Sequence, residues 1–549
     1  MRQEGNGLLI GAYEKDLRFW AEEGTPLDFA HELFADDLDR IEDNMMRAID
    51  RVPVVGTAGI KRVINGPMIW SPDSNVLYGP HPDLKNYFCC NGIIPGFSQS
   101  GGMGLMSAQW MVEGESHYDM FTWDVARFGK WAGKAFTKAR VGDQYSKRFA
   151  IHFPNEERDA GRPVRVRPIY EMQKALGAVF GINYGWEHPQ WFANKPGVAD
   201  TNGFTRQNWF EPVGLECQML RENAGIIDIS NFAKYKVKGT AAASWLNSIF
   251  ANNMPSIVGR SCLTPLIGVR GGIAGDFTVT LLSENEFLII GSGMAERYHQ
   301  RFWNMVPMPQ GVTFESLTEA VCGFNVAGPK SRELLKRLTN ESLSTKEFPF
   351  MRSKKIELAG VECVAIRVSF TGDLGWELHC DVSDQQRLYK ALLETGKAFG
   401  AGPVGARALM SLRIEKGYGS WSREYSPEYW PQEVGLAGLI KLEKDFLNKA
   451  AYLKVKDNSP REMLSMVEIL NVKIADATGG EPIFDKAGNG VGRVTSGSYG
   501  YSVKKSLALC YLKNVSPGEE LDVMVLGKPH SAIVLHEPPF DPTGKKLRT

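Results

Sequence analysis

Short strand-like runs separated by regularly spaced turns fill the end of this chain, from about residue 466 to residue 549. Leu521–Leu526 and Ser531–Leu535 flank the turn Gly527-Lys-Pro529, which is the pattern of a β-hairpin. Another turn is expected at Ala487–Gly490. Short strands of this kind bury their apolar faces only by closing on one another, so the pattern predicts a small β-barrel as the last domain.

The block before it, residues 206–465, mixes the two kinds of hydrophobic periodicity. Phe287–Ile290 and Cys363–Phe370 have the β-branched content and alternation of strands. Ser331–Leu338 and Gln385–Phe399 have helical spacing. We expect an α+β domain of about 260 residues here, which is within the size range of a single large domain.

Residues 151–205 are rich in Arg, Pro, Gly and Asn, a composition typical of a segment that connects two lobes. The aromatic residues of Tyr184–Phe192 predict that this connector packs against a surface.

Residues 1–150 form the first block, which has short strands at Gly7–Ile10 and Val76–Tyr78. Helices are expected near Leu105–Glu113 and Asp124–Lys138. The chain begins with strand, turn and strand, and no G-x-G-x-x-G motif follows a strand near Met1. We therefore expect no dinucleotide-binding βαβ unit at the start of this block, in a multidomain chain of α/β and α+β class.

Charge and cysteine content exclude some classes of protein. Lys plus Arg and Asp plus Glu both number 63, so nothing favours nucleic acid or an anionic membrane as a partner. The 8 cysteines include no C-x-x-C pair, which indicates reduced thiols, and no metal site is predicted. No leader is visible, so the expected location is the cytoplasm, or the mitochondrial matrix if the protein is eukaryotic and an upstream segment is missing.

A glycine-rich run, Cys90–Gly104, leads into the helix expected at Leu105. Glycines before a helix let backbone N–H groups approach an electron-rich ligand, and the helix dipole adds positive potential. The pyrimidine edge of a flavin is a suitable ligand, although a plain structural turn explains the run equally well.

The order of motifs in this block resembles the C-terminal part of the flavin domain in dimethylglycine and sarcosine dehydrogenases. The motifs are Asn65-Gly-Pro67, Ser71-Pro-Asp73, Leu77-Tyr-Gly-Pro80, the glycine run and Gln109–Gly114. The resemblance implies a partial FAD site at Gly96, Phe97, Ser98, Gln99, Gly101 and Gly102, with Tyr13 facing the amine substrate. The family's dinucleotide motif and its flavin-linked histidine are not found, so the ADP half of FAD has no expected site.

From Asn208 to Gly497 a second ordered series of motifs resembles the aminomethyltransferase (glycine-cleavage T-protein) module that is fused to those flavin domains. The series comprises Asn208–Cys217, Arg221–Ser230, Phe232–Gly239, Gly271–Thr280, Ser369–Leu378, Gly405–Lys416 and Gly490–Gly497. The resemblance implies that the module binds tetrahydrofolate.

Four residues acquire roles from this resemblance. Asp276 matches the catalytic aspartate, and a carboxylate there suits the transfer because it accepts a proton or steadies a cationic one-carbon group. Glu377 matches the pterin-binding glutamate, and Arg407 matches the arginine of the folate site. Phe370 stands where many relatives have tyrosine, which keeps stacking but removes a hydroxyl.

Three functions follow as alternatives. The first is FAD-dependent oxidative N-demethylation of a methylated glycine-type amine, dimethylglycine or sarcosine, with one-carbon transfer to tetrahydrofolate and an electron-transfer flavoprotein as possible partner. The second is a flavin-independent, tetrahydrofolate-dependent aminomethyl- or methyltransferase. The third is a non-catalytic fragment or subunit whose partner chain supplies the other half of the flavin domain.

Overall fold

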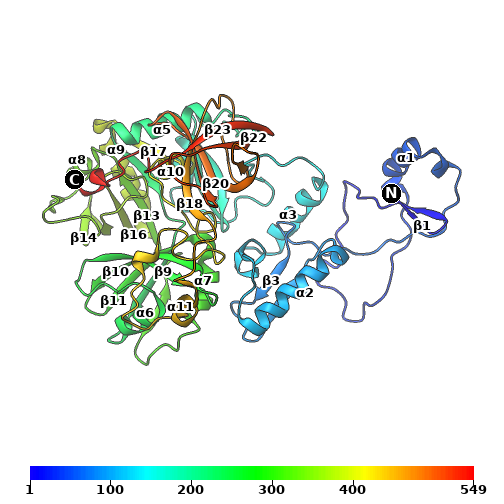
Figure 1. Cartoon of the computed structure of the whole chain (residues 1–549), viewed down its shortest axis with the longest axis horizontal. Coiled ribbons are helices and arrows are strands. Elements are labelled where there is room, and N and C mark those ends of the chain that lie inside the picture. Colours follow the sequence, from blue (N-terminus) through cyan, green and yellow to red (C-terminus); the bar gives the residue numbers. More distant parts are fainter.

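The computed structural model describes residues 1–549, and an N-terminal arm extends away from the main body of the chain (Figure 1). The arm ends in a small unit at the far side of Figure 1, joined to the rest by long irregular segments. The elements of this unit are β1 (Arg2–Glu4), β2 (Gly7–Leu9), η1 (Asp39–Ile41), α1 (Glu42–Arg51) and η2 (Pro53–Gly56).

The rest of the first block forms a unit between the arm and the main body (Figure 1). Tyr78 and Met103 are the buried centre of its small core. Its elements are β3 (Leu77–Pro80), β4 (Phe88–Asn91), α2 (Gly96–Glu113), η3 (Phe121–Trp123), η4 (Val125–Arg127) and α3 (Lys134–Ser146).

Two sequence predictions about this unit were wrong. Helix α2 begins at Gly96, directly after Pro95, so most of the glycine run lies inside the helix and does not precede it. Proline at this boundary lacks an N–H and fits a helix start, whereas interior glycine is tolerated at a cost of about 1 kcal/mol each. The helix expected at Asp124–Lys138 is replaced by short 3₁₀ turns, followed by α3 from Lys134.

The connector packs against the main body, as the aromatic content of Tyr184–Phe192 predicted. It carries α4 (Tyr170–Ala175) and a hairpin of β5 (Ala178–Asn183) and β6 (Trp186–Phe192). Arg167 lies over the ring of Trp186, with its guanidinium carbon 3.7 Å from the ring centroid. The backbone N–H of Phe192 donates to the buried Glu216 carboxylate, which ties β6 to the next domain.

Two sheets form the large domain that follows. The first has the order β12-β8-β11-β10-β9 and packs one face on a core of aromatic and aliphatic side chains. Its strands are β8 (Ala233–Lys238), β9 (Ser261–Ile267), β10 (Ile273–Ser283), β11 (Glu286–Gly291) and β12 (Thr313–Ser316). The associated helices are α6 (Ala242–Ile249), η5 (Gly293–Ala295), α7 (Glu296–Trp303), η8 (Ala437–Leu439) and α11 (Lys449–Val455).

The second sheet has the order β14-β15-β16-β13-β7-β17, in which only the β17–β7 pair is parallel. Its strands are β7 (Gly225–Asp228), β13 (Val321–Ala327), β14 (Ser353–Leu358), β15 (Val361–Ile366), β16 (Gly375–Asp381) and β17 (Gly402–Val404). The helices of this half are α5 (Phe210–Glu222), α8 (Ser331–Lys336), η6 (Val382–Asp384), α9 (Gln385–Gly396), η7 (Lys397–Phe399) and α10 (Ala406–Glu415).

Several sequence predictions for this domain are confirmed. Strand β11 covers Phe287–Ile290, and helices α8 and α9 begin at the expected Ser331 and Gln385. The strand expected at Cys363–Phe370 ends early, at Ile366, because the next residues leave the sheet as a loop.

The predicted barrel is also confirmed. It is closed, in the order β18-β21-β20-β19-β22-β23, and the expected hairpin is the β22–β23 pair. Its strands are β18 (Met463–Ile469), β19 (Pro482–Phe484), β20 (Gly490–Gly500), β21 (Lys505–Leu512), β22 (Glu520–Val525) and β23 (Lys528–Val534), and α12 (Lys545–Arg548) follows. None of the helices in the chain is both long enough and apolar enough to cross a lipid bilayer.

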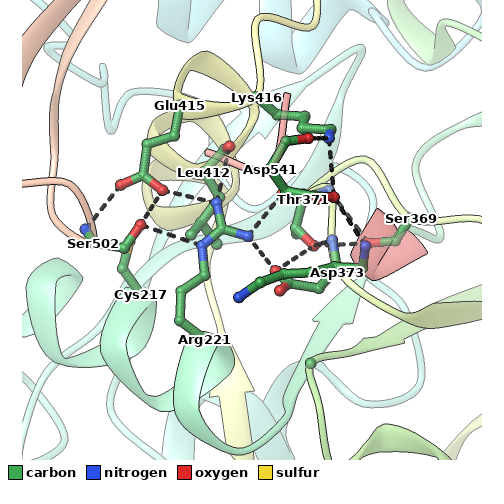
Figure 2. Close-up of polar contacts among 12 residues, drawn as sticks. Cys217, Arg221, Ser369, Thr371, Asp373, Leu412, Glu415, Lys416, Ser502 and Asp541 are labelled. Atoms are coloured by element: carbon green, nitrogen blue, oxygen red, sulfur yellow. Dashed lines mark hydrogen bonds and ion pairs between the residues drawn. The ribbon is translucent and has the colours of Figure 1, made fainter. Parts of the chain in front are cut away.

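A buried arginine on α5 joins the barrel, the second sheet and α10 (Figure 2). Arg221, with only 6% of its side chain exposed, pairs with Asp373 in the β15–β16 loop and with Glu415 at the end of α10. Glu415 also accepts the backbone N–H of Ser502 in the barrel, at 2.8 Å. The ring of Phe540 covers the guanidinium, whose carbon lies 3.4 Å from the ring centroid.

Replacing this arginine therefore leaves two buried carboxylates without their cation. We expect Arg221→Ala to lower the free energy of unfolding by about 3–5 kcal/mol, the usual cost of breaking a buried ion pair from one side. Urea denaturation of the whole chain measures this loss. The control is Lys336 on α8, whose side chain is 47% exposed and pairs with Glu333: Lys336→Ala is expected to change stability by less than about 1 kcal/mol. Equal effects of the two variants would contradict the role given to Arg221.

Candidate functional site

Asp276 lies near the start of β10, on the face of the first sheet that points away from its core. Its neighbour Phe277 faces the core, so Asp276 and Thr278 share the opposite face. Thr278 is paired with Ile290 of β11, which places Ile290 on that face too. A register shift between Ile273 and Gly275 marks a local irregularity just before the aspartate.

Glu377 of β16 lies on the corresponding face of the second sheet. It is paired with Ile366 of β15, and Ile366 packs in one apolar cluster with Leu288 and Ile290 of the first sheet. Directly opposed residues share a face, so Asp276 and Glu377 both point toward the space where the two sheets meet. The topology thus brings together two carboxylates that are about a hundred residues apart in sequence.

The Asp276 carboxylate is half-buried and receives no hydrogen bond from another side chain of the protein. Burial raises its pKa from 3.8 to about 6. Tyr425 lies close enough to sense this carboxylate. Burial is the larger cause that raises the pKa of the Tyr425 phenol, and the charge of Asp276 is the second. A carboxylate with a pKa in this range ionises close to neutral pH and is suited to accept a proton.

An aromatic wall stands behind Asp276. A Cβ placed on Gly275 would lie 2.8 Å from Nε2 of His299, so glycine is needed for this close approach. The His299 ring packs against Phe277 and Trp421, with centroid distances of 4.8 and 5.1 Å. Burial lowers the pKa of His299 to about 3, which keeps the imidazole neutral.

Glu377 is half-buried and lies beside groups that carry or share positive charge. Its Oε2 is 3.4 Å from Nε2 of His379, whose pKa is lowered by burial. Lys234 is fully buried and donates to the carbonyl oxygens of Ser230 and Phe232. Burial, followed by the nearby charge of Arg167, lowers the pKa of Lys234 to about 8. No other side chain hydrogen-bonds to Glu377, so most of its acceptor capacity is unused within the chain.

Phe370 belongs to the loop between β15 and β16, seven residues before Glu377 in the chain. Its ring stacks on Tyr418, with centroids 5.9 Å apart and planes 22° apart. Two anchors hold the loop: Arg221 donates to the Thr371 carbonyl at 2.8 Å, and Asn325 donates to the Val368 carbonyl at 3.3 Å.

Arg407, near the start of α10, has partners outside this group. Its two terminal nitrogens donate to the carboxylate of Asp200 in the connector, and its guanidinium carbon lies 5.0 Å from the Trp209 ring centroid. The contacts found for Arg407 thus tie α10 to the connector, and none joins it to Phe370 or Glu377.

The residues expected to bind flavin lie on the first two turns of α2. Phe97 is fully exposed, at 102% of its reference area, and a Cβ on Gly96, Gly101 or Gly102 would meet no atom within 4 Å. Ser98 donates to the Pro95 carbonyl, whereas Oε1 of Gln99 is buried and receives no hydrogen bond. These side chains form no cradle with other parts of this chain.

Tyr13 lies in an aromatic cluster and not beside α2. Its ring contacts Tyr145 and Phe149, with centroid distances of 6.1 and 5.5 Å. The guanidinium carbon of Arg148 is 4.8 Å from the centroids of both Tyr13 and Trp70.

The sequence reasoning missed the segment that joins the two halves of this site. The segment follows α10 and supplies three aromatic residues. Tyr418 stacks on Phe370, Trp421 contacts His299, and Tyr425 lies near the Asp276 carboxylate. The only signal for it was the aromatic density of Tyr418–Tyr425, directly after the Gly405–Lys416 motif.

Comparison with known proteins places these features in a class. The family model described as "GCVT N-terminal domain" matches residues 169–444, half of the chain, and "Glycine cleavage T-protein C-terminal barrel domain" matches residues 466–541. "FAD dependent oxidoreductase central domain" matches residues 113–166. The crystal structure of the glycine cleavage aminomethyltransferase T from Bartonella henselae shares the fold, with a TM-score of 0.60 and 22% identity over 69% of this chain and 98% of that one. The large domain and the barrel therefore have the T-protein fold.

Curated relatives define the family more closely. The mitochondrial dimethylglycine dehydrogenase of Mus musculus is 36% identical, over 98% of this chain and 63% of its own length. The mitochondrial sarcosine dehydrogenase of the same species is 30% identical, over the whole of this chain and 65% of its own length. The chain belongs to the dimethylglycine/sarcosine dehydrogenase family, and it spans less than two thirds of the length of these relatives.

Proposed function

We propose that this chain binds tetrahydrofolate between its two sheets and transfers to it a one-carbon unit derived from a methylated glycine-type amine. The observation that carries the proposal is the placement of Asp276, a half-buried carboxylate with a pKa raised to about 6, on the face of the first sheet that is turned toward the face of the second sheet bearing the pterin-binding candidate Glu377. The T-protein fold of residues 169–541 supports it.

The residues present fit a folate. Glu377 has free acceptor capacity for the paired N–H groups of a pterin, in the bidentate manner that carboxylates favour. Phe370, in the loop before β16, and Tyr418 present stacked rings on which a flat ring system can pack. Tetrahydrofolate, when bound, supplies the nucleophilic nitrogen that accepts the carbon.

Asp276 then has the proton-transfer role. As a carboxylate it takes the proton that the attacking nitrogen loses, and as a neighbouring negative charge it stabilises a cationic one-carbon group such as an iminium. Burial of this carboxylate removes it from water and raises its pKa, which brings its ionisation close to neutral pH.

FAD-dependent oxidation of dimethylglycine or sarcosine, the reaction that would generate the carbon, is proposed on family membership. The α2 residues are exposed and form no cradle, so we derive no step through FAD from this chain. An electron-transfer flavoprotein as electron acceptor, and a mitochondrial location like that named for the relatives, belong to the same proposal.

Replacing Asp276 tests the proposal. We expect Asp276→Asn to lower the rate of one-carbon transfer from formaldehyde or an iminium donor to tetrahydrofolate by about 10²- to 10⁴-fold, the usual contribution of a general base. Folate affinity should remain within about threefold, because the amide keeps the shape of the side chain. Transfer at the unaltered rate would remove Asp276 from the reaction.

The pH dependence gives an independent test. Because the folded-state pKa of Asp276 is about 6 and the ionised form is the active base, the transfer rate should rise with pH through about 6 and level off above about 7. Single-turnover rates between pH 5 and 8 measure this profile, and the residual rate of Asp276→Asn should lack the step. A rate that falls as pH rises through 6 would show that the protonated acid is the active form.

A further inference from the structure

His379 is a buried histidine beside Glu377 whose polar atoms the fold leaves unused. It lies two residues further along β16, so the two side chains share one face of the second sheet. Only 3% of His379 is exposed, and neither of its ring nitrogens makes a hydrogen bond within the chain. A buried polar group without a partner destabilises a fold, so its presence beside a binding candidate points to a functional reason.

The neighbouring strand makes room for this ring and sets its direction. Gly323 of β13 lies directly opposite His379, and a Cβ on Gly323 would be 3.0 Å from Nδ1 of the imidazole. A side chain at position 323 would therefore crowd the ring. With Nδ1 on the side of β13, the other nitrogen is the one near Glu377: Nε2 is 3.4 Å from Oε2 of that carboxylate.

The residues directly opposite Glu377 on its two neighbouring strands do not hold its carboxylate. On β15 the opposed residue is Ile366, which has no polar group in its side chain. On β13 it is Asn325, whose amide donates to the Val368 carbonyl at 3.3 Å. His379 is therefore the side chain left to donate to Glu377.

The surroundings keep this imidazole neutral. Burial is the largest cause that lowers the pKa of His379; the charge of Lys234 acts in the same direction, and Glu377 opposes both. Lys234 is opposed to Ile290 in the first sheet, so it stands on the face turned toward the second sheet, and its ammonium donates to two backbone carbonyls. A neutral imidazole carries one proton. Because Nε2 has a carboxylate beside it and Nδ1 has no acceptor, we assign that proton to Nε2.

We propose that His379 is the positioning residue for Glu377: its Nε2–H donates to Oε2 and holds the carboxylate in one orientation before a ligand arrives. The inference rests on the proposed function, in which Glu377 recognises the pterin. A glutamate side chain has several rotamers, and fixing it in advance removes an entropic cost from binding. Oε2 can accept a second hydrogen bond and Oε1 receives none from the chain, so both oxygens remain usable by the ligand.

Equilibrium titration of the whole chain with 5-formyltetrahydrofolate tests this role. His379→Leu, which removes the donor but keeps an apolar side chain, should weaken binding about tenfold. His379→Gln should stay within about threefold of the unaltered chain, because its amide supplies a donor near the position of Nε2. In a double variant with Glu377→Gln, His379→Leu should cause no further loss, since the two residues act through one contact. The control is His188→Leu, at a half-buried histidine of β6, which should leave binding unchanged.

Three results would overturn the role given to His379: unaltered affinity in His379→Leu, equal losses in His379→Leu and His379→Gln, or losses that multiply in the double variant. Circular dichroism shows whether each variant is folded. If His379→Leu is not, nitrogen NMR of the histidine-labelled chain decides, with the His379 signals assigned by their absence in His379→Gln: a proton on Nε2 supports the role, and a proton on Nδ1 contradicts it.

The same titrations separate this inference from the proposed function. If Glu377→Gln weakens folate binding and His379→Leu does not, only the positioning role is wrong. If the unaltered chain binds no folate, or Glu377→Gln binds it equally well, the proposed function fails and the positioning role fails with it.

Discussion

The ion pairs of Arg221 are the interaction on which the arrangement of the large domain and the barrel depends. This one side chain, carried by α5, contacts the loop that bears Phe370, the C-terminal end of α10 and, through Glu415, the barrel. Figure 2 shows these three regions converging on its guanidinium. Charges buried at such a junction are costly unless all are paired, so separating these regions would leave Asp373 and Glu415 without their cation. That arrangement fixes where the β15–β16 loop stands relative to Glu377.

The second constraint is the meeting of two sheets over a small apolar cluster. Ile290 from one sheet and Ile366 from the other pack together, and the strand pairings place a carboxylate near each of them. Asp276 is supported by neutral, buried groups that raise its pKa, whereas Glu377 lies beside His379 and Lys234. The two carboxylates have the same chemistry, but their surroundings differ, in keeping with the proposed proton transfer by Asp276 and the proposed pterin recognition by Glu377.

The local sequence pattern was enough to predict elements whose bounds are set by turn residues and hydrophobic periodicity. The hairpin around Gly527 and the starts of α8 and α9 follow from turn chemistry and periodicity within a few residues. The start of α2 could not be predicted in this way. Glycines that disfavour a helix in isolation are held in one here by the packing around Met103.

In the candidate site, too, some residues could be predicted from the sequence, whereas others are brought together only by the fold. Asp276, Glu377 and Phe370 were chosen on motif resemblance, and the topology brings the first two to one space, although their roles stay predictions. The approach of Tyr425 to Asp276 and the pairing of Arg407 with Asp200 join segments about 150 to 200 residues apart, which no local pattern reveals.

The most direct test of the central claim is tetrahydrofolate binding to the whole chain, compared with its Glu377→Gln variant by equilibrium titration of 5-formyltetrahydrofolate, a stable analogue. If Glu377 accepts the pterin N–H groups, the wild-type chain binds saturably and the variant binds at least tenfold more weakly, because the amide places a donor opposite a donor. Equal affinity for the two proteins, or no binding to either, would contradict the placement of folate between the sheets.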